Sequence, residues 1–159
     1  MRKSGIRHVA REYALRVLYG AEIHKKLGEE TPPSSFPNWW TVDDNLSVLP
    51  DAEKFAKLLY QGVHAHQDEI DAIIQKHAHH WRLNRMASVD RNILRLSVFE
   101  LMYNAKIASN IILDEALELA KCYGTEESAR FINGILDSIS HEVRAQSLEN
   151  PANHTPSSP

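Results

Sequence analysis

The sequence predicts an all-α fold, a compact bundle of six helices, with a seventh possible, arranged as two three-helix subdomains. Apolar residues recur with the period of a helix in six successive segments, and no segment alternates with period two for long enough to form a sheet. The chain of 159 residues is long enough for one domain with a real core. We therefore expect a single domain over residues 1–146, followed by a disordered tail over 147–159.

The first helix is expected from Arg7 to Lys26. Its apolar positions at helical spacing are Ala10, Ala14, Val17, Leu18 and Ala21. Gly28 ends this helix, and residues 28–50 are expected to form a long loop because three prolines occur within six residues. The Trp39–Trp40 pair in this loop is expected to pin it onto the core, with ligand binding as the alternative.

A second helix follows Asp51, which can cap it, and a third runs from Asp68 to His80. Trp81, Leu83 and Met86 belong to a hinge between the two halves. Ser88 can cap a fourth helix, from Val89 to Lys106, which is apolar over most of its circumference. A helix of this kind normally lies at the centre of a bundle.

The fifth helix begins at Ser109 or Asn110 and stops at Gly124, a residue that commonly ends helices. Thr125 can cap the sixth helix, which carries the acidic Glu126 and Glu127 in its favourable first turn. The polar, proline-containing segment from about Ser147 is expected to be disordered.

Charge is distributed unevenly along the chain, although the net charge is only −3. Residues 1–26 contain seven Lys or Arg residues and two acids, whereas the remainder contains eleven bases and nineteen acids. Such an asymmetry indicates a polyanion contact at the N-terminal end. A merely solvated helix face is the alternative.

The motifs of several enzyme classes do not occur in the sequence: it contains no GxxxxGK[ST] loop, no GxGxxG and no GxSxG. Cys122 is expected to be a buried packing residue rather than a nucleophile. His77, His79 and His80 lack the further ligands that zinc needs, so we expect a histidine cluster on the surface and no metal. Carboxylate pairs such as Asp114 and Glu118 are four residues apart, a spacing common on the exposed surface of a helix, so we do not expect them to act as a general acid and base. We expect no enzymatic activity and no cofactor.

No apolar run approaches the length of about 20 residues that spans a bilayer, and the N-terminus lacks the apolar region of a secretory signal. Cys122 is the only cysteine, which excludes an intrachain disulfide and suits a cytoplasmic location.

The remaining hypothesis is that the chain acts by binding another molecule. Arg7 and Arg11 are four residues apart and share one side of the first helix. With His8 and the preceding Arg2 and Lys3 they can contact phosphates, and arginine suits both phosphate oxygens and base edges. Single-stranded RNA also needs a planar face for stacking. Phe131 is a candidate for this face, with core packing as the alternative.

Three segments resemble the NusB family in the same order and at similar spacing: RHVAREYALRVLYG, DRNILRLSVFEL and NIILDEALELAKCYGTEESARFINGILD. The resemblance covers roughly residues 5–140 and implies a fold of two three-helix subdomains. It also implies that the chain pairs with the small ribosomal protein that doubles as NusE and binds the boxA element of nascent RNA. The complex would join elongating RNA polymerase with other Nus factors and support ribosomal RNA transcription.

The resemblance also implies roles for particular residues. Arg7 and Arg11 match an arginine-rich RNA-binding motif, in which His8 replaces a frequent arginine. The other residues expected near RNA are Arg95, Glu127 and Phe131; Tyr19, Asp90 and Arg91 are expected at the ribosomal protein. Some family members form dimers, so a homodimer is also possible. A protein-only adaptor and a stand-alone relative of the N-terminal domain of a ribosomal RNA methyltransferase are the alternative functions.

Overall fold

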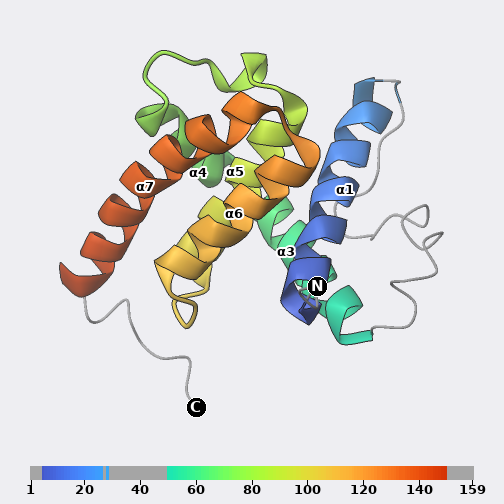
Figure 1. Ribbon diagram of the computed structural model, residues 1–159, viewed down its shortest axis with the longest axis horizontal. Helices are drawn as coiled ribbons and strands as arrows, with labels where there is room; N and C mark the ends of the chain where they lie inside the picture. Colours follow the sequence, from blue (N-terminus) through green and yellow to red (C-terminus); the bar gives the residue numbers. More distant parts are fainter. Residues whose placement is uncertain (1–4, 27, 29–49, 150–159) are drawn as a thin grey trace.

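The computed structural model describes residues 5–26, 28 and 50–149, and all of its regular structure is helical (Figure 1). The helices are α1 (Ile6–Lys26), α3 (Pro50–Ala65), α4 (Gln67–His77), α5 (Ser88–Tyr103), α6 (Ser109–Tyr123) and α7 (Glu126–Glu149), with one 3-10 turn, η2 (Leu83–Arg85). Six α-helices and no strand within these residues confirm the all-α prediction. None of the described helices is long and apolar enough to cross a membrane.

Helix α5 lies at the centre of the bundle, as its apolar circumference predicts. It packs against each of the other described α-helices, which are α1, α3, α4, α6 and α7. Every residue from Arg91 to Leu101 is buried, including Arg91, Arg95 and Glu100. The centre of this fold therefore contains ionised side chains, which must be paired to be tolerated there.

The helix boundaries at the α6–α7 junction agree with the capping residues identified in the sequence. Gly124 follows the last residue of α6 and donates its backbone N–H to the carbonyl of Ala120 at 2.9 Å. Thr125 directly precedes α7, and its backbone N–H donates to the hydroxyl of Ser128 at 2.9 Å.

Other boundaries differ from the expected ones. Helix α4 ends at His77 instead of His80, and α5 ends at Tyr103 instead of Lys106. Helix α7 continues to Glu149, beyond the expected end at 146, because the first helix-breaking residue is Pro151.

Two of the predicted capping residues also lie at other positions in their helices. Asp51 and Ser88 both lie inside the first turn of their helices rather than before it. The predictions for Arg2, Lys3, Trp39, Trp40 and the last ten residues concern parts of the chain outside the described residues.

Candidate nucleic-acid interface

Arg7, in the first turn of α1, is exposed and available to a ligand. Its guanidinium carbon lies 4.7 Å from the centroid of the Phe55 ring on α3, a cation–π contact. It forms no ion pair with any residue that the structure describes. Stacking on Phe55 orients the guanidinium while leaving its N–H donors at the rim, where they can meet phosphate oxygens.

Arg11, one turn further along α1, differs from the prediction of a phosphate contact. Only 4% of its side chain is exposed, and its Nε and Nη2 atoms each donate to a carboxylate oxygen of Glu100 at 2.8 Å. Burial alone would lower the pKa of Arg11, but the hydrogen bonds and charge of Glu100 outweigh burial and raise it. Arg11 thus neutralises a buried acid of α5 and fastens α1 to the centre of the bundle.

His8 is half buried between α1 and α6. Its Nδ1 lies 2.8 Å from Oε2 of Glu115, and the same oxygen lies 3.7 Å from Nη1 of Arg11. Of the three residues expected to contact RNA from α1, the structure thus leaves Arg7 alone without an acidic partner among the described residues.

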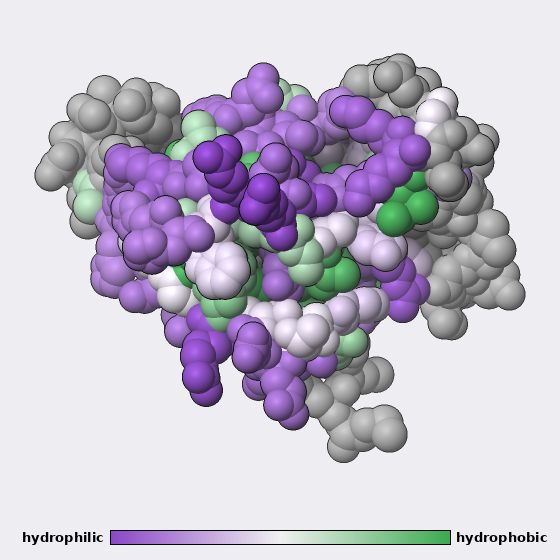
Figure 2. Space-filling view, turned by 90° about the horizontal axis from the view of Figure 1, so that it is seen from above, coloured by the Kyte–Doolittle hydropathy of each residue, from purple (hydrophilic) through white to green (hydrophobic). Residues whose placement is uncertain are grey.

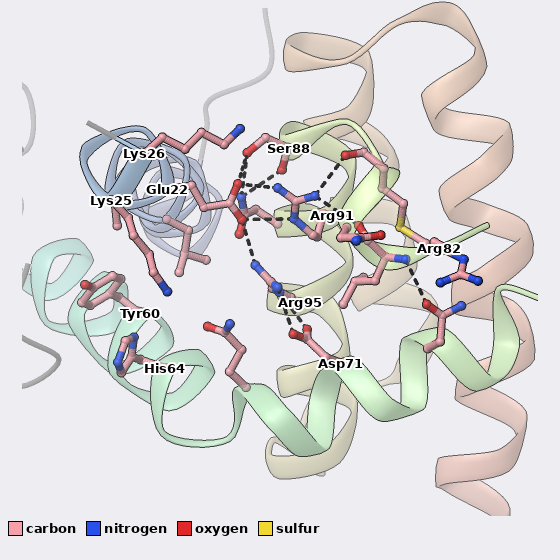
Figure 3. A pocket seen from close by; sticks show the side chains of 18 of the residues that line it. Glu22, Lys25, Lys26, Tyr60, His64, Asp71, Arg82, Ser88, Arg91 and Arg95 are labelled. Carbon is pink, nitrogen blue, oxygen red and sulfur yellow. Dashed lines mark hydrogen bonds and ion pairs between the residues drawn. The ribbon is translucent and has the colours of Figure 1, made fainter. Parts of the chain in front are cut away.

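A cavity of about 1130 Å³ lies where the C-terminal end of α1 faces α4 and the start of α5 (Figure 3). Glu22 of α1 accepts hydrogen bonds from Arg91 Nη2 at 2.6 Å and from Arg95 Nη1 at 2.9 Å. Arg95 also donates to both carboxylate oxygens of Asp71, at 2.8 and 2.9 Å. The two positive charges of these arginines and the two negative charges of these carboxylates therefore neutralise each other in the wall of the cavity.

Arg91 and Arg95 were expected to contact the ribosomal protein and RNA, and the structure gives both a different role. They are 9% and 8% exposed. Arg91 also donates to the backbone carbonyls of Leu83 and Met86, each at 3.1 Å, and so fixes the segment before α5. Both guanidinium groups are paired with internal acceptors, because charges this deep in a bundle are stable only when paired.

Burial by itself would raise the pKa of Glu22, but the hydrogen bonds from Arg91 and Ser88 and the nearby positive charges outweigh it. The pKa of Glu22 is therefore below its ordinary value. The positive charge that this cavity presents comes instead from Lys25, Lys26 and Arg82 on its lining, which are exposed and form no ion pair with the described residues. In Figure 3, Lys25 extends from α1 over the cavity.

Phe131, in the second turn of α7, is half buried, whereas the neighbouring Ile132 is fully buried. Its ring meets that of Trp81 edge to face, with centroids 5.6 Å apart and planes 81° apart. Phe131 thus packs partly against the core and is partly accessible, while Glu127 is exposed one turn earlier. The connection from α4 to α5 and the start of α7 lie at the top of Figure 1. Figure 2 views this side and shows pale and green patches among hydrophilic residues, which are drawn in purple.

The comparison with known proteins decides the family. The NusB family model matches residues 8–141. The chain belongs to the NusB family. The transcription antitermination protein NusB of Myxococcus xanthus is 44% identical over 135 residues, which cover 85% of this chain and 94% of that protein. NusB of Desulforamulus reducens is 44% identical over 133 residues, covering 84% and 88%.

Solved NusB structures share the fold. NusB of T. maritima superimposes with a TM-score of 0.76 at 30% identity, over 94% of this chain and 99% of that one. A crystal structure of the antitermination factors NusB and NusE in complex with dsRNA gives a TM-score of 0.71 at 28% identity, covering 86% and 97%. The relatives are named as antitermination proteins, which confirms the prediction of a protein that is not an enzyme.

The residues predicted at a NusB partner interface lie on α1 and α5. Tyr19 is 41% exposed on α1. Asp90 is half buried at the start of α5, and its Oδ1 is shielded from solvent without a hydrogen-bond partner among the described residues. An acceptor in this state favours a donor supplied from elsewhere, because leaving it unsatisfied is costly. The role of both residues remains a prediction.

Two further expectations concern reactive side chains. Cys122 was expected to be buried but is exposed, because it lies on the outer face of α6 next to the exposed Lys121. His77 faces α7, where its two ring nitrogens lie 2.7 Å from the Ser138 hydroxyl and 2.9 Å from a Glu142 oxygen. The described residues contain no group of three side chains able to hold a metal ion.

Proposed function

We propose that this chain is a transcription antitermination factor that binds boxA-type single-stranded RNA together with the ribosomal protein NusE. In this proposal the complex joins elongating RNA polymerase with other Nus factors and supports ribosomal RNA transcription. The supporting comparisons are the NusB relatives and the related NusB–NusE complex with dsRNA. The observation that carries the proposal is Phe131, a half-exposed aromatic on α7. It lies between the buried Ile132 and the exposed Arg130, which forms no ion pair with the residues that the structure describes.

An accessible aromatic ring favours unpaired RNA as the ligand. Bases in a duplex are stacked on each other, and the major groove of an A-form duplex is too deep and narrow for side chains to read. A ring such as Phe131 can instead stack on a base that is free of a pairing partner. The related complex contains dsRNA, so a comparison of single-stranded and duplex RNA belongs in the test.

The burial of Arg11 and Arg95 makes cooperation with a second protein necessary in this proposal. Each phosphate contact adds to the affinity for RNA and to its salt dependence. Two of the expected contacts are internal ion pairs, so the exposed cations of this chain alone support weak binding. A ribosomal protein docked at Tyr19 and Asp90 would supply further contacts to the same strand.

The test is fluorescence anisotropy with a labelled boxA oligonucleotide, measured with and without the purified ribosomal protein. The matched controls are a single strand of scrambled sequence and a duplex of the same boxA sequence. We expect tighter binding with the partner, a preference for the unpaired boxA strand, and a fall in affinity as salt rises. Equal affinities with and without the partner would contradict cooperation, and binding of neither RNA would favour the protein-only adaptor.

A further inference from the structure

Trp81 lies in the segment between α4 and α5, and the side chain of Gln75 holds the part of this segment around Trp81. The amide nitrogen of Gln75 donates to the carbonyl oxygens of Ala78, at 3.2 Å, and of Trp81, at 2.8 Å. The amide oxygen of Gln75 accepts from the backbone N–H of Leu83 at 2.9 Å. The backbone on both sides of Trp81 is therefore fixed, so the indole projects from a prepared loop rather than from a free one.

The indole itself is open to solvent. Trp81 is 59% exposed, more than any other large hydrophobic residue that the structure describes. Its one ring contact within the described part of the chain is the edge-to-face arrangement with Phe131. An exposed aromatic of this size on a fixed backbone has the features of a binding residue, because a packing role would bury it.

The angle between the two rings determines how bases could stack on them. Their planes are 81° apart, so no single base can lie parallel to both. Two bases can be accommodated if the strand turns between them, one against each ring. Trp81 therefore offers a separate stacking surface and does not merely enlarge that of Phe131.

The charge around the two rings fits a nucleic acid. Arg82 directly follows Trp81, Arg85 lies in η2, and Arg130 directly precedes Phe131. All three are exposed and form no ion pair with the described residues. Glu126 and Glu127 are exposed at the start of α7 and would repel phosphates there, so the backbone of a bound strand is expected on the side of the arginines.

We propose that Trp81 stacks on a base of single-stranded RNA next to the base bound by Phe131, with Arg82 and Arg85 contacting the adjoining phosphates. This proposal rests on the RNA-binding function proposed above and adds a second stacking residue to it. The occupant is an unpaired ribonucleotide, since the patch combines the exposed Trp81 ring and the half-buried Phe131 ring with arginines that have no acidic partner in the described part of the chain.

The first experiment compares RNA affinities of Trp81→Ala, Trp81→Phe and Leu58→Ala in complex with the ribosomal protein. Leu58 is a matched control, because it is a large apolar residue 55% exposed on α3. We expect Trp81→Ala to weaken binding about 5- to 100-fold without changing the salt slope, and Trp81→Phe to retain most of the affinity. Leu58→Ala should bind like the unsubstituted protein. Arg82→Ala should reduce the salt slope by about one.

The second experiment measures the fluorescence of the Trp81 indole. In a Trp39→Phe, Trp40→Phe background Trp81 is the remaining tryptophan, so its fluorescence reports on this site. We expect saturating boxA RNA to quench it, and unchanged emission at saturation would overturn the proposal. This measurement remains decisive if Trp81→Ala fails to fold.

The failure of this proposal can be told apart from the failure of the proposed function. If the unsubstituted protein does not bind RNA, the proposed function fails and this inference fails with it. If the protein binds RNA and Phe131→Ala weakens binding while Trp81→Ala does not, the role of Trp81 alone is overturned. If Trp81→Ala weakens capture of the ribosomal protein and leaves RNA affinity unchanged, the surface binds protein and the proposal is overturned.

Discussion

Arg11 on α1 and Glu100 on α5 form a bidentate ion pair with two hydrogen bonds of 2.8 Å, and their side chains are 4% and 2% exposed. Parallel guanidinium–carboxylate hydrogen bonds are among the stronger polar contacts in proteins. At this burial neither charge can be left without the other. The pair therefore joins the basic N-terminal helix to the central helix and removes one arginine from the RNA-binding surface.

Removal of one member of this pair should destabilise the protein. Arg11→Ala leaves Glu100 as an unpaired buried charge, which costs about 3–5 kcal/mol in free energy of unfolding. Urea denaturation measures this loss. The double variant Arg11→Met, Glu100→Leu should recover most of it, since an apolar pair of similar volume replaces the two charges. Wild-type stability of Arg11→Ala combined with weaker RNA binding would show that Arg11 contacts RNA instead.

In contrast to Arg11→Ala, Arg7→Ala should weaken RNA binding and leave the stability of the protein almost unchanged. Arg7 is exposed and contacts the Phe55 ring, so its loss should change the free energy of unfolding by roughly 1 kcal/mol or less. The slope of log affinity for boxA RNA against log salt concentration should become shallower by about one contact. A series of anisotropy titrations at increasing salt concentration measures this slope, and an unchanged slope would exclude Arg7 as a phosphate contact.

Glu22 should make the stability of the protein sensitive to acid. Its pKa in the folded protein lies below the ordinary value of 4.5, since the hydrogen bonds from Arg91 and Ser88 outweigh the effect of burial. A lowered pKa contributes stability that is complete at neutral pH and is lost as the pH falls below 4.5 toward the folded-state value. Glu22→Gln should therefore be less stable than the unsubstituted protein at neutral pH, and the gap should narrow in acid. Urea unfolding of both proteins across this range tests it, and a gap that widens in acid would contradict it.

Two glycines inside helices should respond oppositely to replacement by alanine. A Cβ at Gly62 of α3 would overlap the ring of Phe99, which is itself buried on α5. A Cβ at Gly134 of α7 would meet nothing within 4 Å. Gly134→Ala should stabilise the protein by about 0.5–1 kcal/mol, whereas Gly62→Ala should lower its melting temperature. Calorimetry of both variants makes the comparison, and equal shifts would show that α3 and α5 can move apart at no cost.

The helices could be predicted from the sequence because each has a clear apolar period and several end at a recognisable cap. Gly124 and Thr125 placed the α6–α7 junction correctly. The end of α4 could not be placed, because the side chain of Gln75, rather than a capping glycine or proline, holds the segment that follows.

The candidate site was harder to predict, because an arginine in an RNA-binding pattern and an arginine that neutralises a buried acid have the same sequence signature. The available signal was Glu100, an acid on the apolar central helix, which required a cation from another element. Arg95 is paired with Asp71 for the same reason, across a separation that no local pattern reveals. The exposure of Trp81 likewise depends on how its loop is held, so the sequence alone predicts only that Trp81 belongs to a hinge.

An NMR titration of the isotope-labelled protein with boxA RNA, in the presence of the ribosomal protein, would locate the RNA-binding surface residue by residue. We expect RNA to shift the resonances of Arg7 and of the first two turns of α7, together with the indole of Trp81. The guanidinium resonances of Arg11 and Arg95 should keep their positions. Shifts confined to a different face, or loss of the Arg11–Glu100 pair on RNA binding, would contradict the account.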